Sequence, residues 1–251
     1  MTDDAIARSL HAGALVVALA RPDAMTDDAL STGLTWLDAS ERERCAALHF
    51  ARDRRIYLAA HALTRALLSA CTGHRPAALS FETDGFGRPQ LRPAGSMRPA
   101  FSLSHTAGLV ACAAWHGNEV GIDVEGLSRP RDELLLAESF FAPSEARALK
   151  HMATAARAER FIATWTLKEA YAKARGLGLG LPFTDFEFAD PQASRPQVRF
   201  LGIDDDPERW HFWSRRCGAG HRLALACAAG RRPVVHELTW ELRASGEHAF
   251  A

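Results

Sequence analysis

Residues 161–181, FIATWTLKEAYAKARGLGLGL, carry charged side chains at a spacing that can support chemistry. Trp165, Glu169 and Lys173 recur every four residues, which places them along one stripe of a helix. Lys168 lies beside this stripe. A carboxylate between two ammonium groups suits a site that must hold a cation and an anion together. The alternative is an ordinary solvated helix face with one Glu-to-Lys pair.

A pair of carboxylates lies in the segment GIDVE. Residues 120–125 alternate as a β-strand does, so Asp123 and Glu125 point to the same face. Two like charges that close together are unfavourable unless something cationic lies between them. Hard oxygen ligands of this kind suit Mg²⁺. The alternative is an edge strand with a wet acidic face.

Three further segments offer groups that bind anions. Ser104 and His105 stand at a predicted turn, where hydroxyl, imidazole and backbone N–H groups can converge on an anion. Arg88 leaves a tight Gly-Arg-Pro turn, and Arg44 belongs to a basic run in which one or two side chains could turn inward to hold phosphate. The alternatives are an exposed turn histidine, an ordinary glycine-rich turn and a solvated helix face.

The elements that would position these groups follow from hydrophobic periodicity. A short helix or loop is expected at residues 27–36, and Ser40 with Glu43 has the spacing of a capping box at the start of the next helical segment. Helices are expected over residues 37–70, 131–158 and 161–175, and strands over 11–19, 78–83, 101–115 (a hairpin), 120–125, 183–188, 210–216 with 222–228 (a hairpin) and 232–242.

The order of elements is repeated in the two halves of the chain. In the first half, HALTRALLSACTG precedes a strand and a hairpin that ends in GLVACAAWHG. In the second half, TLKEAYAKARGLG precedes a strand and a hairpin that ends in HRLALACAAG. This pattern predicts an α/β (α+β) fold with two pseudo-symmetric lobes, residues 1–117 and 118–251, each a helix packed on a small antiparallel sheet. A cleft between the lobes is the expected ligand site.

Composition narrows the class of protein. The 251 residues are 47% hydrophobic and 24% charged with a formal net charge of zero, which gives no global electrostatic case for nucleic-acid or membrane binding. Five scattered cysteines without a Cys-x-x-Cys pair predict neither a zinc site nor a disulfide framework. The apolar run near the N-terminus is short and preceded by acids, so neither a signal peptide nor a membrane span is expected. The expected location is the cytoplasm.

The segments GIDVE and WTLKEAYAKARGLGL, in this order, resemble the signatures of the Sfp-type 4′-phosphopantetheinyl transferases. GRP at residues 87–89, SLSH at residues 102–105 and ERERCAALHFARD around Arg44 extend the resemblance over the chain beyond its N-terminal segment. Each motif is weak alone, but five in the expected order are specific. The resemblance implies a two-lobed α/β fold, coenzyme A as donor, Mg²⁺ as cofactor and an apo acyl or peptidyl carrier protein as acceptor.

The resemblance also implies roles for the acidic and basic residues described above. By motif position, Asp123 and Glu125 look like metal ligands. Glu169 looks like the third ligand, close to the general base. Lys168 and Lys173 resemble the pyrophosphate-binding lysines of the family, and Lys173 would also serve catalysis by neutralising the leaving group.

Four positions match residues that hold the nucleotide end of coenzyme A, chiefly its 3′-phosphate: Arg44, Arg88, Ser104 and His105. The two arginines stand where lysine is frequent in relatives, and both keep the positive charge. Glu145, in FFAPSEARAL, matches a carboxylate that is sometimes given the role of a base.

The function that the resemblance implies is transfer of the 4′-phosphopantetheine arm from coenzyme A to a carrier-protein serine, releasing 3′,5′-ADP. Two alternatives are a Mg²⁺-dependent phosphodiesterase that cleaves coenzyme A with water, and a non-catalytic module that binds coenzyme A or a carrier domain. The intact set of acids and Lys173 argues against pure binding, which would not need a base. A monomer is expected, because the duplicated halves would already build the cleft.

Overall fold

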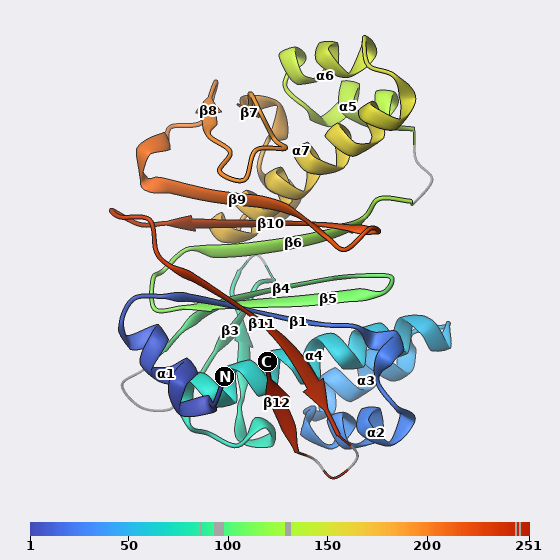
Figure 1. Cartoon of the computed structure of the whole chain (residues 1–251), viewed down its shortest axis with the longest axis vertical. Coiled ribbons are helices and arrows are strands. Elements are labelled where there is room, and N and C mark those ends of the chain that lie inside the picture. The colour runs from blue at the N-terminus through green and yellow to red at the C-terminus, as the bar shows by residue number, and fades with distance from the viewer. Residues whose placement is uncertain (86, 93–97, 129–131, 244, 246) are drawn as a thin grey trace. The chain divides into compact units, whose positions relative to one another are not determined.

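The chain forms two units in the computed structural model, which describes residues 1–85, 87–92, 98–128, 132–243, 245 and 247–251 (Figure 1). Unit 1 comprises Met1–Asn118 together with Pro233–Ala251, and unit 2 comprises Glu119–Arg232. Each unit has its own sheet, its own long helix and its own hydrophobic core. The predicted mixed α/β class is confirmed.

Unit 1 is built on a five-stranded sheet with the order β12-β11-β1-β5-β4. Neighbouring strands run antiparallel, except that β1 and β11 are parallel. The uninterrupted apolar sequences of β1 and β5 suit central, buried strands. The strands are β1 (Leu15–Ala20), β4 (Ala100–Thr106), β5 (Leu109–Trp115), β11 (Val235–Leu242) and β12 (His248–Phe250).

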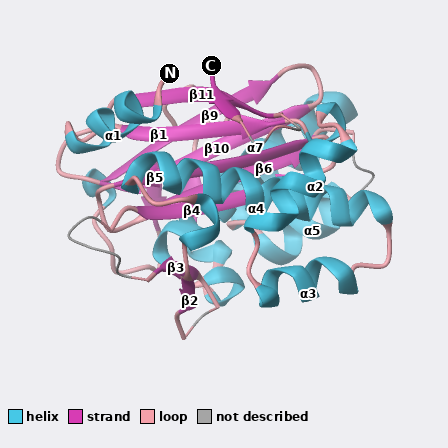
Figure 2. Ribbon diagram, turned by 90° about the horizontal axis from the view of Figure 1, so that it is seen from below, coloured by secondary structure: helices cyan, strands magenta, loops and turns pink. Residues whose placement is uncertain are grey.

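Helix α4 (Ala51–Thr72) crosses one face of this sheet, as Figure 2 shows. It packs mainly on β5 and ends at Gly73, whose φ of +74° lies in the left-handed region that favours glycine. Three shorter helices pack against α4, and a two-stranded ribbon follows it. These elements are α1 (Asp3–His11), α2 (Asp27–Trp36), α3 (Ala39–Ala47), β2 (Phe81–Thr83) and β3 (Pro89–Leu91).

Unit 2 is built on a three-stranded antiparallel sheet with the order β6-β10-β9. Helix α7 (Thr154–Arg175) packs on β6 and β10 and ends at Gly176, which again has a positive φ, +69°. Two short helices pack against α7, and a two-stranded ribbon follows it. The remaining elements are β6 (Val120–Gly126), α5 (Glu133–Phe140), α6 (Pro143–Lys150), β7 (Phe186–Phe188), β8 (Val198–Phe200), β9 (Trp210–Cys217) and β10 (His221–Ala228).

The two units repeat one order of elements. After helix α1 in unit 1, each unit runs from a strand through two short helices into a 22-residue helix, and then forms a two-stranded ribbon and a long hairpin. In unit 1 the first strand and the hairpin are ordered β1-β5-β4, and in unit 2 they are ordered β6-β10-β9. The repeat that the sequence indicates is therefore present in the topology of both units.

Some expected boundaries differ from the structure. The capping box of α3 joins Asp38 and Glu41 rather than Ser40 and Glu43, because the helix begins two residues earlier. The strand expected at 183–188 covers only its last three residues, since residues 183–185 form a 3₁₀ turn. Helix α1 was not expected.

The tail strand belongs to unit 1. The expected second lobe, 118–251, includes this strand, but β11 pairs in parallel with β1, so that Leu15 lies opposite Val235. None of the described helices is both long enough and apolar enough to cross a lipid bilayer.

Candidate active site

Strand β6 presents its acidic residues to helix α7. A Cβ atom built on Gly121 would lie 2.0 Å from the carbonyl oxygen of Ala170 and 2.5 Å from the nitrogen of Ala174, so this position of β6 faces the backbone of α7. Residues two and four places further along a strand share its face, and these are Asp123 and Glu125. The alternation predicted from GIDVE therefore directs both carboxylates toward the helix side of the sheet.

Gly121 permits this close packing. A methyl group at this position would overlap backbone atoms of α7, and backbone cannot move aside as a flexible side chain can. The close approach lets α7 reach Asp123, which is 5% exposed: the Nζ atom of Lys173 donates to its Oδ1 atom at 2.7 Å. The sequence analysis did not single out Gly121, although glycine inside a strand signals close approach of another backbone.

Glu169 lies one helical turn before Lys173 and is partly buried. Burial raises the pKa of its carboxyl to about 7, and the negative charges of Asp123 and Glu125 add to this effect while Lys173 opposes it. The three carboxylates are thus within electrostatic reach of one another. A carboxyl that titrates near neutral pH can accept or release a proton under ordinary conditions.

The donor set fits a hard divalent cation such as Mg²⁺. Burial and the charges of Asp123 and Glu125 raise the pKa of Glu169, and a cation relieves such crowding of negative charge. Oxygen is the ligand atom that Mg²⁺ prefers. As the side chains lie, however, no group of three His, Cys, Asp or Glu residues within the described ranges is placed to share a metal ion. Lys173 instead supplies the positive charge beside Asp123. The predicted ligand set of Asp123, Glu125 and Glu169 therefore stays a prediction.

Lys168 does not join this cluster. Its side chain is completely buried, and its Nζ atom lies 2.8 Å from the Oε2 atom of Glu145. Glu145 is buried as well, and it accepts hydrogen bonds from the backbone N–H groups of Ala142 and Phe188. The structure therefore brings Lys173 to Asp123 but places Lys168 and Glu145 together in the interior of unit 2.

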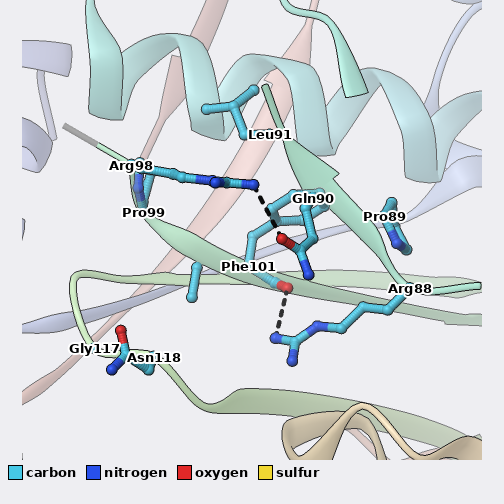
Figure 3. Close-up of a pocket in the computed structure, with 10 residues that line it drawn as sticks. Arg88, Pro89, Gln90, Leu91, Arg98, Pro99, Phe101, Gly117 and Asn118 are labelled. Carbon is cyan, nitrogen blue, oxygen red and sulfur yellow. Dashed lines mark hydrogen bonds between the residues drawn. The ribbon is translucent and has the colours of Figure 1, made fainter. Parts of the chain in front are cut away.

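Unit 1 contains a pocket of about 240 Å³ beside the Gly-Arg-Pro turn. Figure 3 shows Arg88 and Gln90 at its wall, with Arg98 donating to the Oε1 atom of Gln90 at 3.0 Å. The guanidinium of Arg88 reaches the carbonyl oxygen of Phe101 at 3.5 Å, and burial lowers its pKa, although Asp84 opposes this effect. The pocket is lined by Arg88, Pro89, Gln90, Leu91, Arg98, Pro99, Ala100, Phe101, Gly117 and Asn118.

Of the four residues predicted to hold a nucleotide, only Arg88 is among these lining residues. Ser104 is buried within β4, and His105, next to it, is exposed near the end of the strand. Arg44 is exposed in the last turn of α3, beside Tyr57, whose pKa burial raises and the arginine charge lowers. The sequence analysis missed Arg98, Gln90 and Asn118, because no motif marks them.

Comparison with known proteins shows which family contains this sequence. A family model described as "4'-phosphopantetheinyl transferase, N-terminal" matches residues 24–117, and one described as "4'-phosphopantetheinyl transferase superfamily" matches residues 119–228. The L-aminoadipate-semialdehyde dehydrogenase-phosphopantetheinyl transferase of Eremothecium gossypii is 34% identical over 91% of this chain and 84% of its own length. The chain belongs to the 4′-phosphopantetheinyl transferase superfamily. The resemblance predicted from the sequence is confirmed.

Two further relatives carry the same family name. The 4′-phosphopantetheinyl transferase HetI of Nostoc sp. is 30% identical over 65% of this chain and 68% of its own length. The 4′-phosphopantetheinyl transferase Sfp of Bacillus subtilis is 24% identical over 78% of this chain and 84% of its own length. In this member of the superfamily, the match from residue 119 onward contains β6 and α7, and thus all three carboxylates and Lys173.

Proposed function

We propose that this phosphopantetheinyl transferase moves the 4′-phosphopantetheine arm of coenzyme A to a serine of an apo acyl or peptidyl carrier protein, with Mg²⁺ as cofactor and 3′,5′-ADP as the second product. Membership of the superfamily supports the reaction class. The observation that carries the proposal is the cluster on β6 and α7, where Lys173 contacts Asp123 beside a carboxyl that titrates near neutral pH.

The chemistry balances with these residues. The serine hydroxyl oxygen of the carrier forms a bond to the β-phosphorus of coenzyme A, and the bond from that phosphorus to the bridging oxygen breaks. The electron pair leaves with 3′,5′-ADP, and the serine proton passes to Glu169. Since its pKa is raised to about 7, Glu169 is a stronger base than an ordinary carboxylate yet is still largely ionised at slightly alkaline pH.

The reaction also requires that the negative charge of the diphosphate be stabilised, because this group is polyanionic in the substrate and in the transition state. Bound Mg²⁺ supplies Lewis-acid stabilisation of the phosphoryl oxygens. The Nζ atom of Lys173 lies 2.7 Å from Asp123, and its ammonium group can exchange this contact for one with the diphosphate. Its side chain is 29% exposed, so it has access to a ligand.

We assign the nucleotide end of coenzyme A to unit 1. The pocket beside Arg88 has space for a base or a phosphate, and it carries the cations Arg88 and Arg98. Ser104, His105 and Arg44 remain part of this assignment by motif position. The same proposal includes a cytoplasmic, monomeric enzyme with neither nucleic acid nor membrane as a partner, in keeping with its zero formal net charge.

The test is a panel of purified apo carrier proteins of the fatty-acid, polyketide and nonribosomal-peptide classes, each incubated with coenzyme A and Mg²⁺. Intact-protein mass spectrometry should show one phosphopantetheine arm on at least one carrier and none on its serine-to-alanine variant. Cleavage of coenzyme A with every carrier unmodified would instead identify a phosphodiesterase. Calorimetric binding of coenzyme A without any turnover would identify a binding module.

A further inference from the structure

In each unit a buried ion pair connects a short helix to the long helix after it. In unit 1, Glu41 of α3 contacts Arg65 of α4, with 2.6 Å between the Oε2 and Nη2 atoms. In unit 2, Glu145 of α6 contacts Lys168 of α7, with 2.8 Å between the Oε2 and Nζ atoms. Both cations are 0% exposed, and both carboxylates are almost fully buried.

The two pairs occupy equivalent positions. Glu41 and Glu145 are each the third residue of their helix, and each accepts from the backbone N–H of the residue before the helix, Asp38 or Ala142. Arg65 and Lys168 are each the fifteenth residue of a 22-residue helix. Because the pairs share their places in a repeated order of elements, they are two copies of one feature.

Both cations also bind the turn that follows the long helix. Arg65 donates to the carbonyl oxygen of Pro76, the first residue of a 3₁₀ turn, and to that of Leu79, which ends it. Lys168 donates to the carbonyl oxygens of Phe183 and Phe186, which begin and end the corresponding 3₁₀ turn. Each pair therefore connects three elements of its unit: the short helix, the long helix and the turn before the ribbon.

The donors of both cations are fully used inside the fold. An ammonium group has three N–H donors, and those of Lys168 are matched by Glu145, Phe183 and Phe186. A guanidinium has five, and those of Arg65 are matched by Glu41, Asp38 and the two turn carbonyls. Neither cation has a donor left for a phosphate.

The copy in unit 1 lacks the reactive groups. The residues of α4 that correspond to Glu169 and Lys173 are Ala66 and Ala70, and both are buried. The first strand of unit 1, LVVALA, carries no carboxylate, in contrast to β6. Unit 1 thus has the buried ion pair but lacks the counterparts of Glu169, Lys173 and the carboxylates of β6. The ion pair is therefore a feature of the repeated fold and does not require the reactive groups.

We propose that Glu145 and Lys168 are a positioning pair, which fixes helix α7 so that Glu169 and Lys173 face strand β6, and that neither residue binds the diphosphate or acts as the general base. Lys168 and Glu169 are adjacent and diverge by about 100° around the helix axis. Anchoring Lys168 in the core therefore sets the direction of Glu169. The effect on turnover depends on the proposed transferase activity, but the buried anchor itself does not.

Four variants test this proposal: Lys168→Met, Lys168→Arg, Glu145→Gln and, as the matched change in unit 1, Arg65→Met. Each is measured for its urea midpoint of unfolding, its dissociation constant for coenzyme A by calorimetry, and its kcat, KM and pH–rate profile with an apo carrier that the wild type modifies. Lys168→Arg is informative because Arg65 shows that an arginine can form this pair.

We expect Lys168→Met and Arg65→Met each to lower the urea midpoint, because each removes a buried cation from beside a buried carboxylate, although Glu41 keeps its contact with His61. The kcat of Lys168→Met should fall, while its KM and dissociation constant for coenzyme A stay within about threefold of wild type. Lys168→Arg should restore most of the midpoint and of kcat. Glu145→Gln should keep the acidic limb of the pH–rate profile where it lies in wild type.

Other results would overturn the proposal. A rise of about tenfold or more in the dissociation constant for coenzyme A in Lys168→Arg, with the urea midpoint unchanged, would make Lys168 a phosphate ligand. Loss of the acidic limb in Glu145→Gln, without loss of stability, would make Glu145 the base. If wild type modifies no carrier, the proposed function fails separately, and the urea and calorimetric measurements still decide whether this pair anchors the fold or binds coenzyme A.

Discussion

Lys173 of helix α7 and Asp123 of strand β6 are 50 residues apart in the sequence, and their side chains meet at 2.7 Å between Nζ and Oδ1. Asp123 is almost completely buried, whereas Lys173 keeps a face toward solvent. The contact joins the two segments that carry the acidic and basic residues of the proposed reaction. Its geometry makes the pair the natural starting point for mutagenesis.

Removing either member should stop the reaction without unfolding the protein. We expect Asp123→Ala and Lys173→Ala each to lower the rate of carrier modification by about 10²-fold or more, since each removes charge stabilisation from a polyanionic transition state. The rate is measured by mass spectrometry, and the fold by circular dichroism. Lys150→Ala is the matched control, because Lys150 is exposed and pairs with Glu138 at the surface. Near wild-type rates in either site variant would remove that residue from the mechanism.

Gly121 should tolerate no side chain. Gly121→Ala would drive a methyl group against the backbone of α7, so we expect a loss of about 3 kcal/mol in the free energy of unfolding, together with loss of turnover. Urea denaturation measures the first and carrier modification the second. In unit 2, Gly230 has open space around its Cβ position, so Gly230→Ala should behave as wild type. Equal stability of the two variants would contradict the close packing of α7 on β6.

The raised pKa of Glu169 should make the metal-free protein less stable as the pH rises. The folded state holds this proton up to a pH of about 7, whereas the unfolded state releases it near 4.5, so the stability from proton binding is lost as pH rises through 7. After allowing for the partial exposure of Glu169, we expect the free energy of unfolding to fall by on the order of 2 kcal/mol from pH 5 to pH 8.

Urea titrations of wild type and Glu169→Gln in EDTA measure this difference, because the glutamine variant shares every other titrating group. Mg²⁺ should stabilise wild type more at pH 8 than at pH 6, since the ion competes with the proton. Identical pH slopes for the two proteins would show that Glu169 does not titrate near neutrality.

Arg88 should bind the 3′-phosphate at the nucleotide end of coenzyme A. We expect Arg88→Ala to weaken binding of coenzyme A by about tenfold or more and to change binding of 3′-dephospho-coenzyme A much less, because in the proposed assignment Arg88 forms a charged hydrogen bond to the 3′-phosphate. Calorimetry with both ligands measures this. Arg243→Ala, at an exposed position in the same unit, is the control. An equal loss for both ligands would assign Arg88 to the base or the diphosphate.

Much of the fold was predictable because its signals are local. The alternation of GIDVE, the periodicity of α7 and its glycine stop, and the repeat of helix, strand and hairpin all depend on neighbouring residues. The pairing of β11 with β1 joins Val235 to Leu15 and leaves no local signal, so it was not predicted. The capping box of α3 lies two residues before the predicted one, because both Asp38 and Ser40 are good capping residues.

The sequence predicted which residue types form the candidate site, but not which side chains contact one another. Lys168 and Lys173 look alike in the sequence, yet Lys168 is buried in the core and Lys173 contacts Asp123. The structure gives the reason: Thr164 and Tyr171, one turn before and after Lys168 on its face of the helix, are both buried, so this face of α7 lies in the core. Nothing in the sequence marked Glu145 as its partner, because that contact depends on how α6 packs against α7.

The most direct measurement of the central claim follows both products of one incubation of the wild-type enzyme with apo carrier, coenzyme A and Mg²⁺. The account predicts that the carrier gains one phosphopantetheine arm for every molecule of 3′,5′-ADP released, and that EDTA stops both. Release of 3′,5′-ADP with the carrier serine unmodified would contradict it.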